Sequence, residues 1–363
     1  MVQIGMLEGP DEYVIGQLAG TLLLPGDSIL IADATAHELR VFDPSGKFAR
    51  KVGRKGDGPG EFTWLTAVHV YAGDSIVVLD HEGGRANVLG RDFGYARRFR
   101  PRLLETRARP PMTSHDLIGF FSDGRALVSD FLNVCGPRRT DGFCEDSVAF
   151  YRTNEDGSTE ARLGSFVYSR EESVEVRSGP STGWSEPHPQ PMRTLHDNRF
   201  YYGDAKRFEI QVFGANGELE RRIRVAGIAP RYQKKDVWAP PSPAAAANPR
   251  LKGTLAALEA ARAKATMPDT FPSFSDLLVD QAGNIWVREY VPQMHLRKVR
   301  PRWYVFDPEG RLRWSLRSTP GMMRFFRPYT RKSPQIANDR VLTTVRDADN
   351  VESVVVYRLV KRN

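Results

Sequence analysis

The chain contains only two cysteines among its 363 residues, and it has no run of about 18 apolar residues. The absence of such a run excludes a helix that spans a membrane. Two cysteines alone cannot form a structural zinc site, because that site needs four ligands. Cys135 and Cys144 stand close together in one loop-like stretch, so we predict a local disulfide between them rather than two free thiols.

A secretory signal is missing as well, because the N-terminus has neither a basic region nor an apolar stretch. Residues 1–5 nevertheless lead straight into a repeat motif, as they would in a mature chain whose signal has been removed. Disulfides persist in oxidising compartments. These observations favour a periplasmic or secreted protein, with the cytoplasm as the alternative.

Concentrated charge and the common enzyme motifs are also absent. The net charge is +8, but the basic residues are dispersed and no recognition motif accompanies them, so a nucleic-acid partner is not favoured. The His-x-x-x-His spacing of helical zinc sites does not occur. The glycine-rich stretch from Gly56 to Gly60 is not followed by a predicted helix, so its glycines are assigned to a turn rather than to a phosphate site.

Glycine and proline, in contrast, are abundant, with 31 and 25 residues. This composition is typical of short strands joined by tight turns. Six times along the chain a turn signal precedes a β-rich run, and Asx-Gly and related pairs suit hairpins because they accept positive φ. The six runs are Asp27–Asp33, Asp74–Asp80, Asp123–Asp130, Asp197–Asp204, Ala282–Val287 and Asn338–Thr343.

A second hairpin follows in most of these units. Val41–Phe48, Val212–Leu219 and Val305–Leu312 are clear examples, and Tyr151–Gly157 is a looser one. Four strands in each of six units predict an all-β fold, a six-bladed β-propeller of four-stranded antiparallel blades. Residues 1–363 are therefore expected to form a single domain.

The two ends of the chain are predicted to close the ring. After the sixth turn signal the chain supplies one more strand, Ser353–Leu359, so the last blade lacks its outermost strand. Val2–Ile4 is placed to fill that position and to complete the last blade. Closure removes the open edge that otherwise invites association, and we expect a monomer.

A linker motif supports the repeat. Gly53–Phe62 precedes the second unit, and Gly5–Tyr13 repeats its order of Gly, Pro, acid and aromatic residue in a degenerate form. With the strand, Asp turn and apolar run that follow, the motif resembles the NHL-like repeats of a bacterial six-bladed β-propeller family marked by Gly-Asp-Gly-Pro-Gly-Glu-Phe. The resemblance covers the first two blades, while the other four match by turn pattern alone. It implies the fold and an exported protein, and it implies no particular activity.

The longest crossover, residues 228–271 between blades 4 and 5, is predicted to contain a helix. Asn248 can cap this helix, Pro249 suits its first position, and Pro268 ends it. Leu251, Leu255 and Leu258 share one face. We expect this stripe to pack over the crossover or the rim, and a mobile lid is the alternative.

Variation in loop length identifies the expected functional face. Turns that join the first to the second strand of a blade are uniformly short, whereas the second-to-third turns and the crossovers vary, with long examples at about 132–146, 166–190, 228–271 and 318–334. Elaboration on one face of a rigid scaffold is how loops acquire binding roles. The residues expected to bind a ligand at this mouth of the channel are Trp64, Glu186, Ser275, Arg288, Tyr290, Tyr329 and Arg331.

Carboxylates and histidines at the same mouth suggest two kinds of chemistry. Asp116, Glu186 and Asp276 could together hold Ca²⁺, which takes six to eight oxygen ligands, and calcium-dependent propeller lactonases and esterases resemble this arrangement. Pairing with arginine is the alternative. His115 beside Asp116, and His188 near Glu186, are candidates for a general base with an orienting carboxylate, against plain surface roles.

Aspartates also recur at the ends of strands, and their repetition favours turn capping over metal binding. They are Asp33, Asp80, Asp130 and Asp204.

Two functions remain open from the sequence. The first is a non-catalytic binding module for a small molecule, glycan or protein, and the second is a calcium-dependent hydrolase or lyase that acts on a small molecule. The first is favoured because no acid–base–nucleophile constellation is visible. No cofactor other than Ca²⁺ is suggested.

Overall fold

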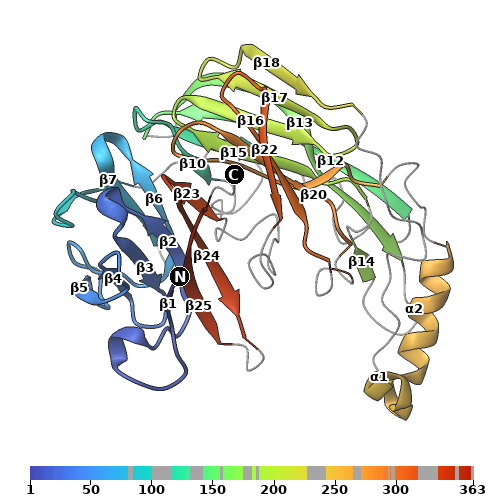
Figure 1. The fold of residues 1–363 in the computed structure, drawn as a ribbon, viewed down its shortest axis with the longest axis horizontal. Coiled ribbons are helices and arrows are strands. Elements are labelled where there is room, and N and C mark those ends of the chain that lie inside the picture. Colours follow the sequence, from blue (N-terminus) through green and yellow to red (C-terminus); the bar gives the residue numbers. More distant parts are fainter. Residues whose placement is uncertain are drawn as a thin grey trace.

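The computed structural model shows a six-bladed β-propeller, as predicted (Figure 1). The residues that the structure describes are 1–80, 85–99, 117–130, 142–155, 158–174, 182–184, 188–226, 243–264, 271–292, 295, 299–317, 334–347 and 351–360. Five sheets have four strands and the third has five. In the first five sheets the strands follow one another in sequence order, from the innermost strand outward. In the sixth sheet the order from the axis outward is β23, β24, β25 and β1, so the N-terminal strand is the outermost.

The first three blades are formed by residues 18–184. Blade 1 contains β2 (Leu18–Leu23), β3 (Ile29–Asp33), β4 (Glu38–Phe42) and β5 (Phe48–Val52). Blade 2 contains β6 (Leu65–Tyr71), β7 (Ser75–Asp80), β8 (Arg85–Leu89) and β9 (Tyr95–Phe99). Blade 3 contains β10 (Leu117–Phe120), β11 (Ala126–Asp130), β12 (Gly142–Thr153), β13 (Thr159–Val174) and β14 (Thr182–Trp184).

The last three blades complete the ring. Blade 4 contains β15 (Pro191–His196), β16 (Arg199–Asp204), β17 (Glu209–Gly214) and β18 (Leu219–Arg224). Blade 5 contains β19 (Phe274–Val279), β20 (Ile285–Glu289), β21 (Arg302–Phe306) and β22 (Leu312–Arg317). Blade 6 contains β23 (Gln335–Ala337), β24 (Arg340–Arg346), β25 (Glu352–Arg358) and β1 (Val2–Ile4).

The predicted closure by the N-terminal strand is confirmed. β1 pairs antiparallel with β25, with Val2 opposite Val356 and Ile4 opposite Val354. The side chain of Ile4 is 1% exposed and packs in a cluster that joins blades 6 and 1. The first and last parts of the chain therefore share one sheet and one part of the core.

The hydrophobic core lies between the blades, in six clusters of buried side chains. Each cluster joins two neighbouring blades; the one between blades 1 and 2, for example, combines Leu22 and Leu30 with Leu65 and Val78. The other five clusters join the remaining pairs of neighbours around the ring. Strands with apolar residues on both faces, such as Ile29–Asp33, are explained by this arrangement, because both faces of a blade are covered.

The turns between first and second strands, which we call inner turns, follow the predicted chemistry. Asp27, Asp74, Asp197 and Asn338 adopt φ values between 49° and 62°, the left-handed region that Asx residues tolerate best after glycine. The short 3₁₀ turns η2 (Pro25–Asp27) and η3 (Ala72–Asp74) form two of these inner turns.

The linker Gly53–Phe62 is a crossover between blades 1 and 2, and the residues of its motif have structural roles. Phe62 is buried in the cluster between blades 1 and 2, and Glu61 accepts hydrogen bonds from Gly58 N and Arg54 Nε, both at 2.8 Å. Gly53 has φ +85°, and a Cβ there would lie 2.2 Å from the ring of Phe62. In the degenerate copy, which contains η1 (Asp11–Tyr13), Tyr13 Oη accepts from Phe48 N at 3.0 Å.

Blade 3 contains strands where the sequence predicted loops. Residues 142–146 and 166–174 were predicted to lie in a turn and a crossover, but they form the long antiparallel pair β12–β13, in which Gly142 is opposite Ser173. β14 then adds a fifth strand to β13. The sequence signal was missed because this extension contains charged and small residues rather than an apolar run.

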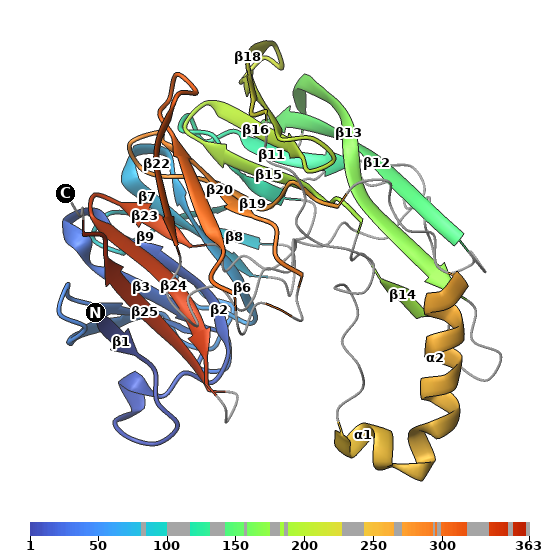
Figure 2. The ribbon, with the colours of Figure 1, turned by 45° about the vertical axis from the view of Figure 1, so that its right-hand side comes forward.

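The helical insertion between blades 4 and 5 is confirmed. Its described part comprises α1 (Pro243–Ala247), the 3₁₀ turn η5 (Pro249–Leu251) and α2 (Lys252–Lys264). The Asn248 side chain accepts from Arg250 N at 3.0 Å, and Pro249 takes the first position of η5. Both helices lie away from the six blades, beyond the end of β14 (Figures 1 and 2). Neither helix in this described part is long and apolar enough to span a membrane.

Candidate functional site

The loop-bearing mouth of the channel is described only in part. His115, Asp116, Glu186, Tyr329, Arg331 and Cys135 lie outside the described residues. Cys144 is buried on β12, opposite Glu171, and its pairing with Cys135 stays a prediction. The predictions for His188, Trp64, Ser275, Arg288, Tyr290 and Asp276 can be compared with the structure.

Trp64 stands where blade 2 begins, and its side chain is 54% exposed. Its backbone N–H donates to Asp80 Oδ1 at 2.9 Å, which anchors the main chain at this residue. Tyr290, by contrast, is buried just after β20, and the Ser275 hydroxyl donates to Glu289 O at 3.3 Å. Of these three predicted ligand-binding residues, only Trp64 presents a large exposed surface.

Asp276 and Arg288 form a buried ion pair in blade 5. They are directly opposite each other on β19 and β20, both are almost fully buried, and Arg288 Nε donates to Asp276 Oδ2. Burial raises the pKa of Asp276 to about 7, and the guanidinium of Arg288 opposes that rise. The second oxygen, Oδ1, is buried and has no hydrogen-bond partner among the described residues. The equivalent pairs in blades 1 and 2, Gly20–Ala32 and Ala67–Leu79, contain no charge.

His188 lies in the crossover into blade 4 and is 4% exposed. Burial, with a further contribution from the positive charge of Arg170, lowers its pKa to about 4. Its ring lies 4.8 Å from that of Phe143. Arg170 fixes the same crossover, because it donates to Pro189 O and to both oxygens of Asp204.

Three of the strand-end aspartates, Asp33, Asp80 and Asp204, are capping groups, as predicted, and capping by Asp130 stays a prediction. Asp33 accepts from the backbone N–H groups of Gly16, Gln17, Thr35 and Ala36. Asp80 accepts from Thr63 N at 2.8 Å and Trp64 N at 2.9 Å, and it pairs with Arg85. Asp204 accepts from Lys206 N and pairs with Arg170. These carboxylates tie each crossover to the blade that it enters.

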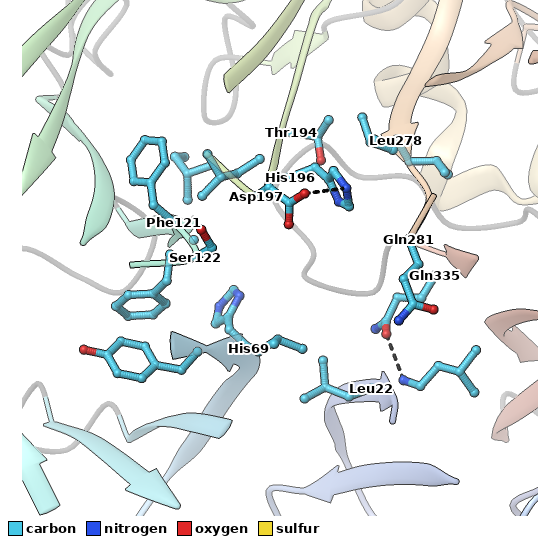
Figure 3. Close-up of a pocket in the computed structure, with 18 of the residues that line it drawn as sticks. Leu22, His69, Phe121, Ser122, Thr194, His196, Asp197, Leu278, Gln281 and Gln335 are labelled. Carbon is cyan, nitrogen blue, oxygen red and sulfur yellow. Dashed lines mark hydrogen bonds and ion pairs between the residues drawn. The ribbon is translucent and has the colours of Figure 1, made fainter. Parts of the chain in front are cut away.

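A cavity of about 680 Å³ lies on the axis of the ring, at the end where the inner turns lie. We call it the central cavity. All six blades contribute to its wall, through the ends of β2, β6, β10, β15, β19 and β23 and the inner turns that follow some of them (Figure 3). The wall is therefore made mainly of paired strands rather than of long loops.

The lining of the central cavity combines apolar and polar groups in comparable amounts. Leu22, Val70 and Leu278 are among its apolar residues, and the side chain of Val70 is 55% exposed. His69, Asp197 and Gln335 border the same space from blades 2, 4 and 6 (Figure 3).

Two histidines belong to this lining. His196 Nε2 lies 3.4 Å from Asp197 Oδ2, and the His69 ring packs edge-on to Phe120 at 6.0 Å between centroids. Tyr71 closes the wall beside His69; burial raises its pKa to about 12, and its hydroxyl is hydrogen-bonded to Glu155. Tyr71 is thus a neutral wall residue at physiological pH.

The residues of the central cavity were missed by the sequence reasoning. That reasoning followed loop length, and the inner turns are the short ones. His69 and the His196–Asp197 pair stand at the ends of innermost strands, so their position in the repeat was the available signal. Within the described ranges, no group of three or more His, Cys, Asp or Glu residues is arranged to hold a metal ion.

Comparisons with known proteins support the fold. A family described as a six-bladed beta-propeller matches residues 4–86, which is less than half of the chain. A member of the DUF4221 family from Bacteroides vulgatus has a similar structure, with 8% identity, a TM-score of 0.51 and coverage of 98% of this chain and 96% of its own. No curated protein matches the sequence.

Two further solved structures are similar at lower scores. A Bacteroides fragilis protein has 14% identity and a TM-score of 0.49, over 99% of this chain and 94% of its own. A gluconolactonase from Xanthomonas campestris has 14% identity and a TM-score of 0.39, over 94% of this chain and 87% of its own.

Proposed function

We propose that this propeller is a binding protein that holds a small organic molecule in the central cavity. The observation that carries the proposal is a cavity of about 680 Å³ to which all six blades contribute. Sites for small molecules have volumes of about 300–1,000 Å³, and they combine apolar walls with a few polar groups. The volume of the central cavity lies within this range, and its wall offers both apolar and polar groups to a ligand.

The wall supports binding without a large rearrangement. Its strands are held in four- or five-stranded sheets whose faces pack on the neighbouring blades. A preformed wall reduces the ordering cost that otherwise opposes association. His69 and the His196–Asp197 pair would then fix the orientation of the ligand, while Leu22, Val70 and Leu278 contact its apolar parts.

The proposal is tested by filling the cavity from one side. A diverse fragment library is screened by ligand-observed NMR, and the hits are measured against wild type, Val70→Trp and Val360→Trp. Val70 lines the cavity, whereas Val360 is 78% exposed beyond β25 and serves as the matched control.

We expect Val70→Trp to weaken the hits at least tenfold and Val360→Trp to leave them unchanged. Equal binding to both variants, or no binder from the library, would contradict the proposal.

A calcium-dependent hydrolase or lyase is the second candidate, and one observation favours it. Within the part of the chain that the structure describes, Asp276 Oδ1 is buried without a hydrogen-bond partner, as an oxygen awaiting a cation would be. The arginine on Oδ2 is unfavourable to a cation at the same carboxylate, so the described residues fit calcium poorly. The other proposed ligands, Asp116 and Glu186, stay predictions.

Thermal unfolding with calcium, zinc or EDTA tests the second candidate. A calcium-dependent rise in melting temperature that Asp276→Asn abolishes, together with turnover of a screened ester or lactone, would favour it over the binding proposal. Absence of any response to metal or chelator would count against it.

A further inference from the structure

We propose that the ligand of the central cavity carries an amide group and binds to the open main-chain edges of the innermost strands. This inference rests on the proposed binding function and specifies the chemistry of the ligand. It depends on two hydrogen bonds that amide groups of the protein already make to innermost strands. It also depends on the register of β6 and β19, whose inner edges make no such bond within the described part of the chain.

The first contact is a side-chain amide on the inner edge of β2. Gln335, which comes from blade 6, accepts from Leu23 N at 2.9 Å through Oε1 and donates to Thr21 O through Nε2 (Figure 3). One carboxamide thus satisfies a donor and an acceptor of the same strand, as a neighbouring strand would. The edge of an innermost strand in this cavity therefore accepts an amide.

The second contact is made by a main-chain amide. Gln281 N, just after β19, donates to Ile336 O on β23 at 3.0 Å. The inner edges of blades 1 and 6 are thus each engaged by an amide group from elsewhere in the chain. Both contacts lie at the wall of the cavity, since Gln281, Gln335 and Ile336 all line it.

Strand register places equivalent open edges on β6 and β19. Leu22 is opposite Leu30, and in the same position of the repeat His69 is opposite Val77 and Leu278 is opposite Trp286. In antiparallel pairs the backbone groups of alternate residues point toward the partner strand and away from it. The backbone groups of Thr21 and Leu23 point toward the axis, where they bond to Gln335. The backbone groups of the residues that flank His69 and Leu278 therefore point toward the axis as well.

These flanking residues are Val68 and Val70 on β6, and Leu277 and Val279 on β19. Within the described part of the chain, the axis-facing backbone groups of these four residues have no hydrogen-bond partner from the protein. All four residues line the central cavity.

An amide suits such an edge better than a simple ion does. Each edge offers N–H donors and C=O acceptors in alternation, and both are strong hydrogen-bonding groups. A carboxylate satisfies only the donors and an ammonium group only the acceptors, whereas an amide satisfies both. Strand addition by extended peptides uses the same pairing. Water is the competing occupant, because it also pairs with both kinds of group.

The first test uses the contact that the protein already makes. Gln335→Ala removes the internal amide and exposes Thr21 O and Leu23 N, and propionamide reproduces the lost group. We expect propionamide to raise the melting temperature of Gln335→Ala more than that of wild type, and propionate to have no such effect. Equal effects of propionamide on the two proteins would overturn the assignment of this edge as an amide site.

The second test compares ligands on the wild-type protein. Capped tripeptides, the same tripeptides with one amide replaced by an ester, and N-acetylated monosaccharides are titrated and followed by NMR. We expect a capped amide to bind and its ester counterpart to bind at least tenfold more weakly, with Val70→Trp reducing the binding and Val360→Trp leaving it unchanged. The peptide and sugar arms distinguish the two sources of an amide.

The outcomes separate the two proposals. The amide inference is overturned if no amide ligand binds, or if the ester binds as well as the amide. The binding function still stands in that case, provided that other fragments bind and that Val70→Trp blocks their binding. If nothing binds to the cavity, both are overturned.

Discussion

Asp33 and Asp80 show how one side chain can fix a whole crossover. The Asp33 carboxylate accepts from four backbone N–H groups, two of them in the chain that enters blade 1 and two in the turn that follows β3. The recurrence of aspartate at this place in the repeat was enough to predict capping. The arginines that complete the groups, Arg40 and Arg85, were not predicted, because arginine is frequent everywhere in this sequence.

His188 gives a prediction about pH at the same scale. Burial and Arg170 lower its pKa to about 4 in the folded protein, against about 6.5 when it is exposed. Between these values the unfolded chain binds a proton that the folded chain does not, so the free energy of unfolding falls as the pH is lowered from about 6.5 towards 4. Above about pH 6.5 both states are neutral and the contribution is constant.

The measurement is the urea midpoint as a function of pH for wild type and His188→Gln. Carboxylates that titrate in the same range are common to both proteins, so the difference between the two curves isolates His188. We expect the variant to lose less stability than wild type on acidification. Parallel curves would show that the histidine is not kept neutral by the fold.

The crossover is the element whose geometry depends most on a single residue. Asp80 is fully buried and accepts from Thr63 N, Thr63 Oγ1 and Trp64 N, besides pairing with Arg85. In Asp80→Asn an amide group replaces one acceptor oxygen and the charge on Arg85 loses its buried partner. We expect a loss of about 3 kcal/mol in the free energy of unfolding.

Asp92→Asn is the matched control, because Asp92 is exposed and accepts a hydrogen bond from Gly94 N at 2.9 Å. Urea unfolding of the two variants should differ by about 2 kcal/mol or more. A similar small loss in both would mean that the crossover is held by Phe62 and the linker glycines rather than by the carboxylate.

Elements differ in how readily the sequence predicted them. Asn248 and Pro249 identified the helical insertion, because capping is decided by residues close in sequence. The sequence predicted the hairpin of β12 and β13 around Tyr151–Gly157 but not its extension, because the extension pairs Gly142 with Ser173 and no local pattern of apolar residues marks it. Arg170, on that extension, then reaches Asp204 of the next blade, a contact that only the three-dimensional arrangement creates.

For the whole molecule, the ring depends on β1. Ile4 is almost fully buried between Leu18 of blade 1 and Val354 of blade 6. Ile4→Ala should lower the free energy of unfolding by about 2–4 kcal/mol, because it removes buried apolar volume at the seam of the ring. Chemical unfolding measures this loss.

Gln3→Ala serves as the control on the same strand, since Gln3 makes a single side-chain hydrogen bond, to Ser353 Oγ at 3.3 Å. Its cost should be below about 1 kcal/mol. Equal costs for the two variants would contradict a structural role for the N-terminal strand in closing the ring.

The sequence predicted the ring and its closure better than it predicted the candidate site. Repeated turns fix the number of blades, since each unit carries its own signal. The central cavity is formed instead by three to six residues from each blade, including His69, Asp197 and Gln335, and their convergence depends on how the blades are arranged. Loop length pointed to the opposite mouth, where five of the eleven predicted residues lie outside the described part.

The pairing of Val2 with Val356 also has a consequence for the order of folding. Contacts between residues so distant in sequence form slowly, because the entropy of closing the loop is lost before the contact is made. During refolding, β25 therefore presents an open edge until β1 arrives, and a second chain can take its place. The yield of refolding should therefore fall as the protein concentration rises. The steepness of this fall depends on how well β1 of the same chain competes with β1 of another chain for the edge of β25.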